Sequence, residues 1–366
     1  MKVSCITRHA ISNYGSLLQA YATQRAVESL GHEFEIMDYV PACEDVSQQV
    51  RTLLSTKPSW NGNPLKKSVY RLLMEPETRV AGKRFARERS QLLKMSPHYA
   101  SLEELKANPP KADVYMTGSD QVWGPGKEGI NPDSIYFLSF ADDNQKYSYA
   151  ASFGVADISD VKAMQLRPLL KNFQSFSVRE KSALNIVKKI TGKNGVCHID
   201  PTLLLNKDEW QKISVKKIDK PYILVFNVKP VKSLIDFAEK LSKKTGIPVV
   251  YITDNPQKKR KNFTYVSAPT VEEFLGYFAN ADYTVTNSFH GTAFSVIFHK
   301  NMFVEYETAK GFNHRAKNLL QTIGINREIK DGEAVTTDID WNKVDNILQA
   351  ERKHSLDYLK DIIKGE

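Results

Sequence analysis

His290 directly follows a predicted strand, at the start of a predicted helix. Residues 283–286 alternate in polarity and are β-prone, whereas apolar residues over 293–297 recur at helical spacing. An imidazole in this position can contact a phosphate or a carboxylate and transfer a proton. The alternative is a helix-capping turn in which the histidine is only structural.

Two further features of the chain suit an anion. Backbone N–H groups at a helix start, together with the helix dipole, favour negative charge, and the residues at this junction are Ser288, Gly291 and Thr292. Arg179 lies at another predicted strand-to-helix junction, and its planar guanidinium binds a carboxylate or phosphate through two N–H groups. The alternative for Arg179 is an arginine that caps a surface turn.

Asp120 lies at the end of a third predicted strand, in the sequence Gly-Ser-Asp-Gln. Its carboxylate can accept a proton or a hydrogen bond from a hydroxyl group. An Asx turn that caps a helix is the alternative interpretation. Arg315 belongs to a cationic group after a later strand, which completes a phosphate site or forms a surface cluster at a helix start.

Strands and helices alternate along the chain and position these residues at strand ends. Strands are predicted at 2–7, 33–40, 113–117, 146–152, 175–178 and 196–199, with the last completing a first sheet. A second set is predicted at 221–228, 249–253, 264–266, 283–286 and 303–306. We therefore predict an N-terminal α/β domain (1–205), a C-terminal α/β domain (206–340) and a final helix (341–366) that crosses back to the first domain.

The composition favours anionic partners. Lys plus Arg exceed Asp plus Glu by 51 − 42 = 9 in 366 residues, a size that suits two domains. Phosphorylated metabolites, acidic glycans and a membrane surface all fit this excess. The sequence has no RNA-binding signature, zinc-finger spacing or basic-region heptad, so nucleic acid is not an expected partner.

The three cysteines predict a reduced, cytosolic protein. Cys5, Cys43 and Cys197 are far apart and include no Cys-x-x-Cys pair. The N-terminus turns polar too soon for a secretory signal, and no apolar run approaches the ~18–20 residues of a membrane span. No His, Asp or Glu cluster has metal-ligand spacing, so we expect no metal.

A basic segment interrupts the alternation within a predicted helical insert (about 41–110). From Lys57 to His98 there are ten Lys or Arg and three Glu residues. A solvated helical face explains such a run, and so does a landing surface for an anionic acceptor or the inner membrane leaflet. The expected location is therefore cytoplasmic, with peripheral membrane contact through 57–98 as the sharper hypothesis.

Four blocks of the chain together resemble the polysaccharide pyruvyl transferase family, in the family's order. They spread over roughly residues 1–330 and are Asn13–Ala20 (NYGSLLQA), Gly118–Trp123 (GSDQVW), Phe176–Lys181 (FSVREK) followed by Asp200–Leu204 (DPTLL), and Asn287–Ala293 (NSFHGTA). The resemblance implies two Rossmann-like domains that face a cleft, the glycosyltransferase-B type of α/β fold.

The resemblance also implies an activity, the transfer of pyruvyl from phosphoenolpyruvate to a sugar. The acceptor is expected to be a cell-surface polysaccharide or its precursor, such as a lipid-linked saccharide, and the product a cyclic ketal. Phosphoenolpyruvate is the donor substrate, and no other cofactor is expected.

Site residues follow from the matching blocks. Arg179 matches the arginine of the donor-binding block, and His290 matches the functional histidine, which protonates the donor methylene or binds the departing phosphate. The expected donor-binding residues are Arg179, Ser288, His290, Gly291, Thr292 and Arg315, with Arg179 and His290 facing each other. The expected acceptor-binding residues are Asn13, Tyr14, Gly15, Ser119, Asp120 and Gln121, and Asp120 is also a catalytic candidate.

Two other functions suit the same fold. One is a nucleotide-sugar-dependent glycosyltransferase, which releases a nucleoside diphosphate instead of inorganic phosphate. The other is a non-catalytic protein that binds a glycan or an anion, against which Arg179 and His290 both argue.

Overall fold

The computed structural model describes residues 1–41, 44, 54, 62–124, 134–228, 231–253, 259–308, 311–334 and 338–364. Cys43 and residues 57–61 of the predicted basic segment lie outside these ranges. The chain falls into two compact units. The first comprises Met1–Pro201 and His354–Glu366, and the second comprises Thr202–Lys353.

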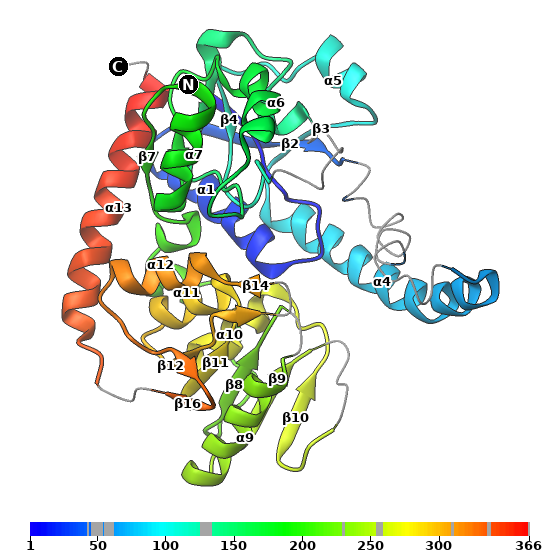
Figure 1. Cartoon of the computed structure of the whole chain (residues 1–366), viewed down its shortest axis with the longest axis vertical. Helices are drawn as coiled ribbons and strands as arrows, with labels where there is room; N and C mark the ends of the chain where they lie inside the picture. Colours follow the sequence, from blue (N-terminus) through cyan, green and yellow to red (C-terminus); the bar gives the residue numbers. More distant parts are fainter. Residues whose placement is uncertain are drawn as a thin grey trace. The chain divides into compact units, whose positions relative to one another are not determined.

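The first unit is built on a parallel five-stranded sheet with the order β3-β2-β1-β4-β5 (Figure 1). Short apolar runs form its central strands, as expected for a parallel sheet covered on both faces. The strands are β1 (Lys2–Ile6), β2 (Glu33–Tyr39), β3 (Met95–Tyr99), β4 (Val114–Thr117) and β5 (Lys146–Ser148). β3 lies inside the region predicted as a helical insert.

Helices of the first unit connect these strands. They are α1 (Tyr14–Ser29), α4 (Pro64–Leu92), α5 (Leu102–Ala107), α6 (Asp160–Leu170) and α7 (Lys181–Thr191), with 3-10 turns at Ser134–Phe137 and Asp143–Gln145. Gly31, with φ 82°, follows α1 in the left-handed conformation that a glycine adopts without strain.

The prediction that residues 196–199 complete the first sheet is wrong. β6 (Ser177–Val178) and β7 (Val196–Cys197) form a separate parallel pair. Isolated bridges, such as Ala151 with Val178, connect this pair to the segment after β5. The extended run is too short for a full strand because the chain turns at Asp200 toward the 3-10 turn Pro201–Leu203.

An aromatic core fixes the segment that follows β4. The fully buried Trp123 packs against four phenylalanine rings, with centroids 5.4–6.4 Å away: Phe137, Phe153, Phe173 and Phe176. Its indole N–H donates to the carbonyl of Tyr136 at 3.0 Å. This anchor lies three residues after Asp120, so it restrains the loop that carries the carboxylate.

The second unit repeats the topology of the first. Its parallel sheet has the order β10-β9-β8-β11-β12. The strands are β8 (Ile223–Phe226), β9 (Val249–Ile252), β10 (Phe263–Val266), β11 (Tyr283–Thr286) and β12 (Asn301–Val304). Two short hairpins pair β13 (Glu307–Thr308) with β14 (Gly311–Phe312), and β15 (Ile329–Lys330) with β16 (Glu333–Ala334).

Helices of the second unit include one that is buried along its whole length. They are α8 (Lys207–Gln211), α9 (Lys232–Thr245), α10 (Val271–Asn280), α11 (Phe289–Ile297) and α12 (His314–Thr322). Every residue of α11 is buried. Phe294 of α11 packs against Phe274 and Phe278 of α10, which holds α11 in place.

The last helix, α13 (Trp341–Lys364), contributes residues to both units. Val344 and Leu348 are buried in its first part, and Leu359 and Ile363 in its last part. None of the helices that the structure describes combines the length and apolarity of a membrane span. Two parallel sheets connected by helices confirm the predicted α/β class.

Candidate functional site

Both sheets place polar residues at the point where the strand order reverses. In the first unit, the chain passes from β1 to β2 toward one edge of the sheet, and from β4 to β5 toward the other edge. In the second unit, the steps from β8 to β9 and from β11 to β12 diverge in the same way. Ligands of open α/β sheets bind outside the carboxyl ends of strands at this switch point. The loops after these four strands are therefore the candidate sites.

In the first unit, hydrogen bonds tie the ends of β1 and β4 together. Thr7 Oγ1 donates to the carbonyl of Ser119 at 2.7 Å. Gln19 Nε2 donates to Thr7 Oγ1 and to the carbonyl of Ser16, each at 2.9 Å. Alanine at Gly118 would bring its Cβ to 3.0 Å from Cys5 Sγ, so the two strands approach closely there.

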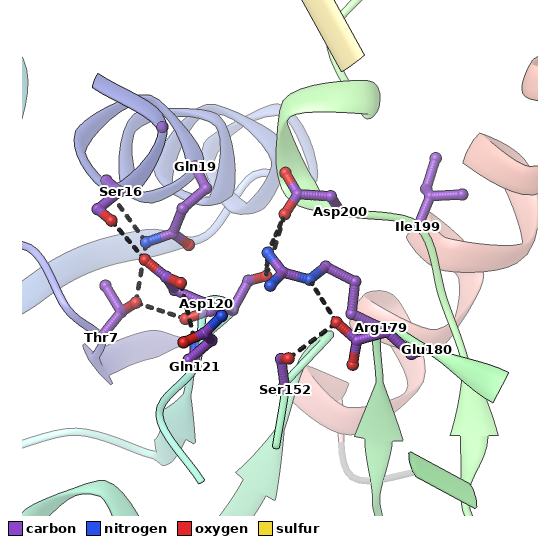
Figure 2. A network of polar contacts seen from close by, with 12 residues as sticks. Thr7, Ser16, Gln19, Asp120, Gln121, Ser152, Arg179, Glu180, Ile199 and Asp200 are labelled. Atoms are coloured by element: carbon purple, nitrogen blue, oxygen red, sulfur yellow. Dashed lines mark hydrogen bonds and ion pairs between the residues drawn. The ribbon is translucent and has the colours of Figure 1, made fainter. Parts of the chain in front are cut away.

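Asp120 occupies a left-handed backbone conformation with φ 75°. Beside glycine, asparagine and aspartate adopt this region most readily, because their short side chains hydrogen-bond to the nearby backbone. The side chain is buried, and its Oδ2 accepts a very short hydrogen bond from Ser16 Oγ (Figure 2). Oδ1 accepts from the backbone N–H of Gln121 at 2.7 Å.

Arg179 lies beside Asp120 in a network of buried charges (Figure 2). Its Nη1 contacts Asp200 Oδ2 at 2.6 Å, and its Nε contacts Glu180 Oε1 at 3.2 Å. Ser119 Oγ donates to the same Asp200 oxygen at 3.3 Å, and Ser152 Oγ donates to Glu180 at 2.8 Å. The guanidinium is only 2% exposed, so it is a component of the interior.

The charge balance of this network is negative. Burial opposes the charge of Arg179, but attraction by Glu180, Asp200 and Asp120 outweighs it and raises the pKa of the guanidinium above its usual range. Among the described residues, these three buried carboxylates face the Arg179 guanidinium. The guanidinium of Arg8, which pairs with Glu44, also attracts Asp120. Such a network hydrogen-bonds neutral hydroxyl groups better than it binds an anion, because an incoming anion would meet three negative charges.

The start of α1 borders the same network. Asn13 is the N-cap of α1, and its Oδ1 accepts from the N–H groups of Gly15 and Ser16 at 2.8 and 3.2 Å. Tyr14 instead contacts α4, where its ring lies 5.0 Å from Phe85 and its hydroxyl accepts from Arg84 at 3.3 Å. Asn13 and Gly15 thus position Ser16, which is the residue that contacts Asp120.

In the second unit, the start of α11 is tightly built around glycine and hydroxyl groups. Ser288 is the N-cap, and its Oγ accepts from the N–H of Gly291 at 3.3 Å. Thr292 Oγ1 donates to the carbonyl of Ser288 at 2.9 Å. Thr286 Oγ1 accepts from the N–H of Ser288 at 3.0 Å and donates to the carbonyl of Phe226.

His290 lies in the first turn of α11 and is 8% exposed. Its ring contacts the ring of Phe289 edge-on at 5.0 Å, and the guanidinium of Arg315 lies 5.7 Å from the centre of that ring. Asn313 Nδ2 donates to the carbonyl of Asn287 at 2.9 Å. The start of α12 is therefore tied to the start of α11.

Two buried amide groups lie at the ends of β8 and β11. Asn287 is 2% exposed, and its Oδ1 accepts from the N–H of Val228 at 3.4 Å. Asn227 Oδ1 accepts from the hydroxyl of Tyr251 at 3.1 Å. Within the described part of the chain, neither Nδ2 atom has a hydrogen-bond partner. Buried donors of this kind are costly unless a ligand or water satisfies them.

The structure brings the predicted site residues together in two groups. Ser119, Asp120, Gln121 and Arg179 lie in the first unit, next to the α1 start. Ser288, His290, Gly291, Thr292 and Arg315 lie in the second unit. That Arg179 and His290 share one donor stays a prediction.

Sequence reasoning assigned no role to four members of the first network: Ser16, Gln19, Glu180 and Asp200. Asp200 carried a signal, because it lies in one of the four matching blocks, and Glu180 follows Arg179 directly. Ser16 and Gln19 also lie in a matching block, Asn13–Ala20, where both were interpreted only as positions on a helix. Among the described residues, no group of three or more His, Cys, Asp or Glu side chains is suited to hold a metal ion.

Comparisons with solved structures show the fold. The UDP-GlcNAc 2-epimerase from Neisseria meningitidis bound to UDP-GlcNAc matches with a TM-score of 0.51 and 12% identity, over 100% of this chain and 93% of that one. Arabidopsis thaliana UGT89C1 complexed with UDP-L-rhamnose matches with a TM-score of 0.50 and 8% identity, over 99% and 98%. The fold is therefore of the glycosyltransferase-B type, as predicted.

The family is shown by a sequence comparison. No curated protein matches the chain significantly. The family model for polysaccharide pyruvyl transferase matches residues 13–305, a stretch that contains every predicted site residue except Arg315. The chain therefore belongs to the polysaccharide pyruvyl transferase family.

Proposed function

We propose that this transferase moves pyruvyl from phosphoenolpyruvate to a sugar of a cell-surface polysaccharide or its precursor, and forms a pyruvate ketal. The observation that carries the proposal is the start of α11, which lies inside the family match, carries His290 in its first turn and follows the buried amide of Asn287. Phosphoenolpyruvate carries a carboxylate and a phosphate, and both suit a helix start.

The first step adds one acceptor hydroxyl to the donor. The hydroxyl oxygen bonds to C2 of phosphoenolpyruvate, the methylene carbon takes a proton, and the hydroxyl loses its own proton. In the second step, a neighbouring hydroxyl oxygen bonds to the same carbon, the bond from that carbon to the phosphate oxygen breaks, and inorganic phosphate departs with the proton of that hydroxyl. We assign proton transfer to the donor methylene to His290, since it is the titratable side chain in the first turn of α11.

Acceptor activation is assigned to the first unit. The carboxylate of Asp120 is buried and accepts from Ser16, so a sugar hydroxyl in the place of Ser16 Oγ would donate to the same oxygen. The guanidinium of Arg179 and the carboxylate of Asp120 attract each other, and this attraction contributes to the raised pKa of Arg179. The donor-binding role predicted for Arg179 stays a prediction, because Asp200 and Glu180 compete with any anion for its N–H groups.

The test is phosphate release with phosphoenolpyruvate and a panel of surface oligosaccharides, followed by phosphorus NMR. His290→Gln should lose about 10²–10⁴-fold in turnover while calorimetry still detects donor binding, because glutamine hydrogen-bonds but does not transfer a proton. His299→Gln is the matched control, since His299 follows the opposite end of α11 and pairs with Asp345 at 2.9 Å.

Three outcomes would contradict the proposal or part of it. A parallel loss of donor affinity in His290→Gln, with no further loss of rate, would make His290 a binding residue. Release of a nucleoside diphosphate from a nucleotide sugar, without phosphate release from phosphoenolpyruvate, would favour a glycosyltransferase. Binding of either donor or glycan without any product would indicate a non-catalytic protein.

A further inference from the structure

Helix α4 has two parts with opposite environments. Its C-terminal part packs into the first unit, where Phe85 is 7% exposed and contacts Tyr14. Its N-terminal part extends away from the sheet of the first unit (Figure 1). We call residues 62–72 the α4 tip. Apart from the buried Tyr70 and the half-buried Lys67, every residue of the tip is exposed.

The α4 tip carries large apolar side chains on its exposed face. Leu65 is 74% exposed, Val69 42% and Leu72 76%. Their spacing of four and three residues places all three on one side of an α-helix. Val80, which is 69% exposed, lies fifteen residues after Leu65 and continues the same stripe at 3.6 residues per turn. If this face of α4 were only charged and hydrated, it would have no need of large exposed apolar side chains.

Basic residues accompany the stripe within the α4 tip. The α4 tip contains Lys66, Lys67 and Arg71, and no Asp or Glu. The acidic residues of α4 come later in the helix: Glu75 and Glu77, whose side chains lie outside the described residues, and Glu88, which is buried 3.7 Å from Arg84. An exposed apolar stripe flanked by basic residues is typical of a helix that lies in the interface of an anionic membrane.

A bilayer surface satisfies both features at once. The acyl region receives the leucine and valine side chains, whereas Lys and Arg extend their long stems so that the cationic heads reach lipid phosphates. A second copy of this chain fits less well, because two identical α4 tips would bring the basic residues of each next to those of the other.

We propose that the α4 tip docks this protein on an anionic lipid bilayer, with Leu65, Val69 and Leu72 inserted at the interface. This contact does not depend on which donor the enzyme uses. Membrane binding by the basic segment would then have two contributions: attraction of its charges to anionic lipid, and insertion of apolar side chains.

Co-sedimentation of the full-length protein with vesicles tests this docking. Vesicles of phosphatidylcholine alone are compared with equimolar phosphatidylcholine and phosphatidylglycerol at low and high salt. Replacing Leu65, Val69 and Leu72 together by serine should weaken binding to the anionic vesicles by on the order of tenfold to a hundredfold. Replacing Lys66, Lys67 and Arg71 by glutamine should weaken it on the order of tenfold and remove most of its salt dependence.

The matched control removes exposed apolar side chains elsewhere in the first unit. Val155 is 41% exposed, Val161 62% and Met164 63%, and their replacement by serine should leave vesicle binding unchanged. Equal binding by the α4-tip serine variant and the wild type would overturn the proposal, and so would equal binding to neutral and anionic vesicles. Dimers that the same serine variant abolishes, with no vesicle binding, would assign the stripe to a second copy instead.

Discussion

The two units have the same strand order, but among the described residues only the first has a cluster of buried charged residues at its switch point. At the switch point of the first unit, Arg179 lies within the interior with three carboxylates, and two of these, Glu180 and Asp200, pair with its guanidinium. At the switch point of the second unit, the groups are a helix start, hydroxyls and amides, and two buried Nδ2 atoms have no partner among the described residues.

The first unit thus presents a site of paired charges, and the second unit a site of neutral hydrogen-bonding groups. Buried ions are retained only where opposite charges compensate their loss of hydration. The first network is therefore expected to be stabilised by its own members, and it positions Asp120, to which acceptor activation is assigned. The second site leaves donors unsatisfied, which is the arrangement expected where a polar ligand binds.

The largest expected effect comes from removing the cation of the first unit. Arg179→Ala leaves Glu180 and Asp200 buried without their counter-charge, which should lower the free energy of unfolding by about 3–5 kcal/mol. Hydrogen exchange of peptides from each unit should show the loss in the first unit and little change in the second. His290→Gln should change the free energy of unfolding by less than about 1 kcal/mol.

An exposed arginine provides the control for Arg179→Ala. Arg25 pairs with Glu28 at 2.9 Å, but its side chain is 53% exposed. Exposed pairs contribute about 0–1 kcal/mol, so Arg25→Ala should be nearly neutral. If Arg179→Ala were as mild as Arg25→Ala, the first network would not be self-compensating and the contrast between the units would fail.

Elements with a clear apolar pattern were predictable from the sequence, whereas a strand that depends on its neighbour in the sheet was not. β11 and α10 begin and end where the alternation and helical spacing predict, because both are apolar elements with clear boundaries. β3 was missed, since its sequence Met-Ser-Pro-His-Tyr has no alternation and gains its place from pairing with β2. Edge strands of this kind depend on tertiary contacts more than on local preference.

The candidate site divides in the same way. Asp120, Arg179 and His290 stand out in the sequence because each lies just after a strand. Their environments depend on residues distant in sequence: Asp120 meets Ser16, 104 positions away, and Arg179 meets Asp200, 21 positions away. No periodicity encodes such contacts, so the burial of Arg179 among carboxylates could not be predicted.

A second prediction concerns pH and again distinguishes the units. In the first unit, burial and the neighbouring His354 lower the pKa of His198 from 6.5 to about 4. Besides His354, the titratable groups that face it are Tyr149 and Tyr358, whose rings lie 6.0 and 4.5 Å away. Its Nδ1 lies 2.7 Å from Ser177 Oγ. Between about pH 4 and pH 6.5, His198 is therefore neutral in the folded protein but protonated in the unfolded chain.

The sign of the effect follows from this difference. Below pH 6.5 the unfolded chain binds a proton that folded His198 binds only near pH 4, so stability falls as the pH decreases through that window. The loss approaches about 3 kcal/mol for a shift of this size. His198→Asn should reduce the difference in unfolding free energy between pH 7 and pH 4.5, whereas His299→Asn should not. An unchanged difference in His198→Asn would assign the acid sensitivity to other groups.

The smallest predicted effect compares a glycine at each switch point. Alanine stabilises a helix by up to about 1 kcal/mol relative to glycine, so Gly291→Ala in α11 would be favourable if the site were open. Instead, a Cβ at Gly291 would overlap Thr286 Oγ1 and lie 3.2 Å from Phe226 Cδ1. Thr286 Oγ1 is held by two backbone hydrogen bonds, so the overlap should cost about 1–3 kcal/mol.

Gly118→Ala in the first unit should cost less, because its closest contacts are Cys5 Sγ at 3.0 Å and Thr7 Cβ at 3.1 Å, which require only a small shift. Denaturant unfolding of both variants measures the two costs. Thr286→Ala removes the overlapping atom, so Gly291→Ala should cost less in that background than in the wild type. Additive effects would mean that α11 moves away from β11 as a unit, and the start of α11 would then be less rigid than the contacts of Thr286 indicate.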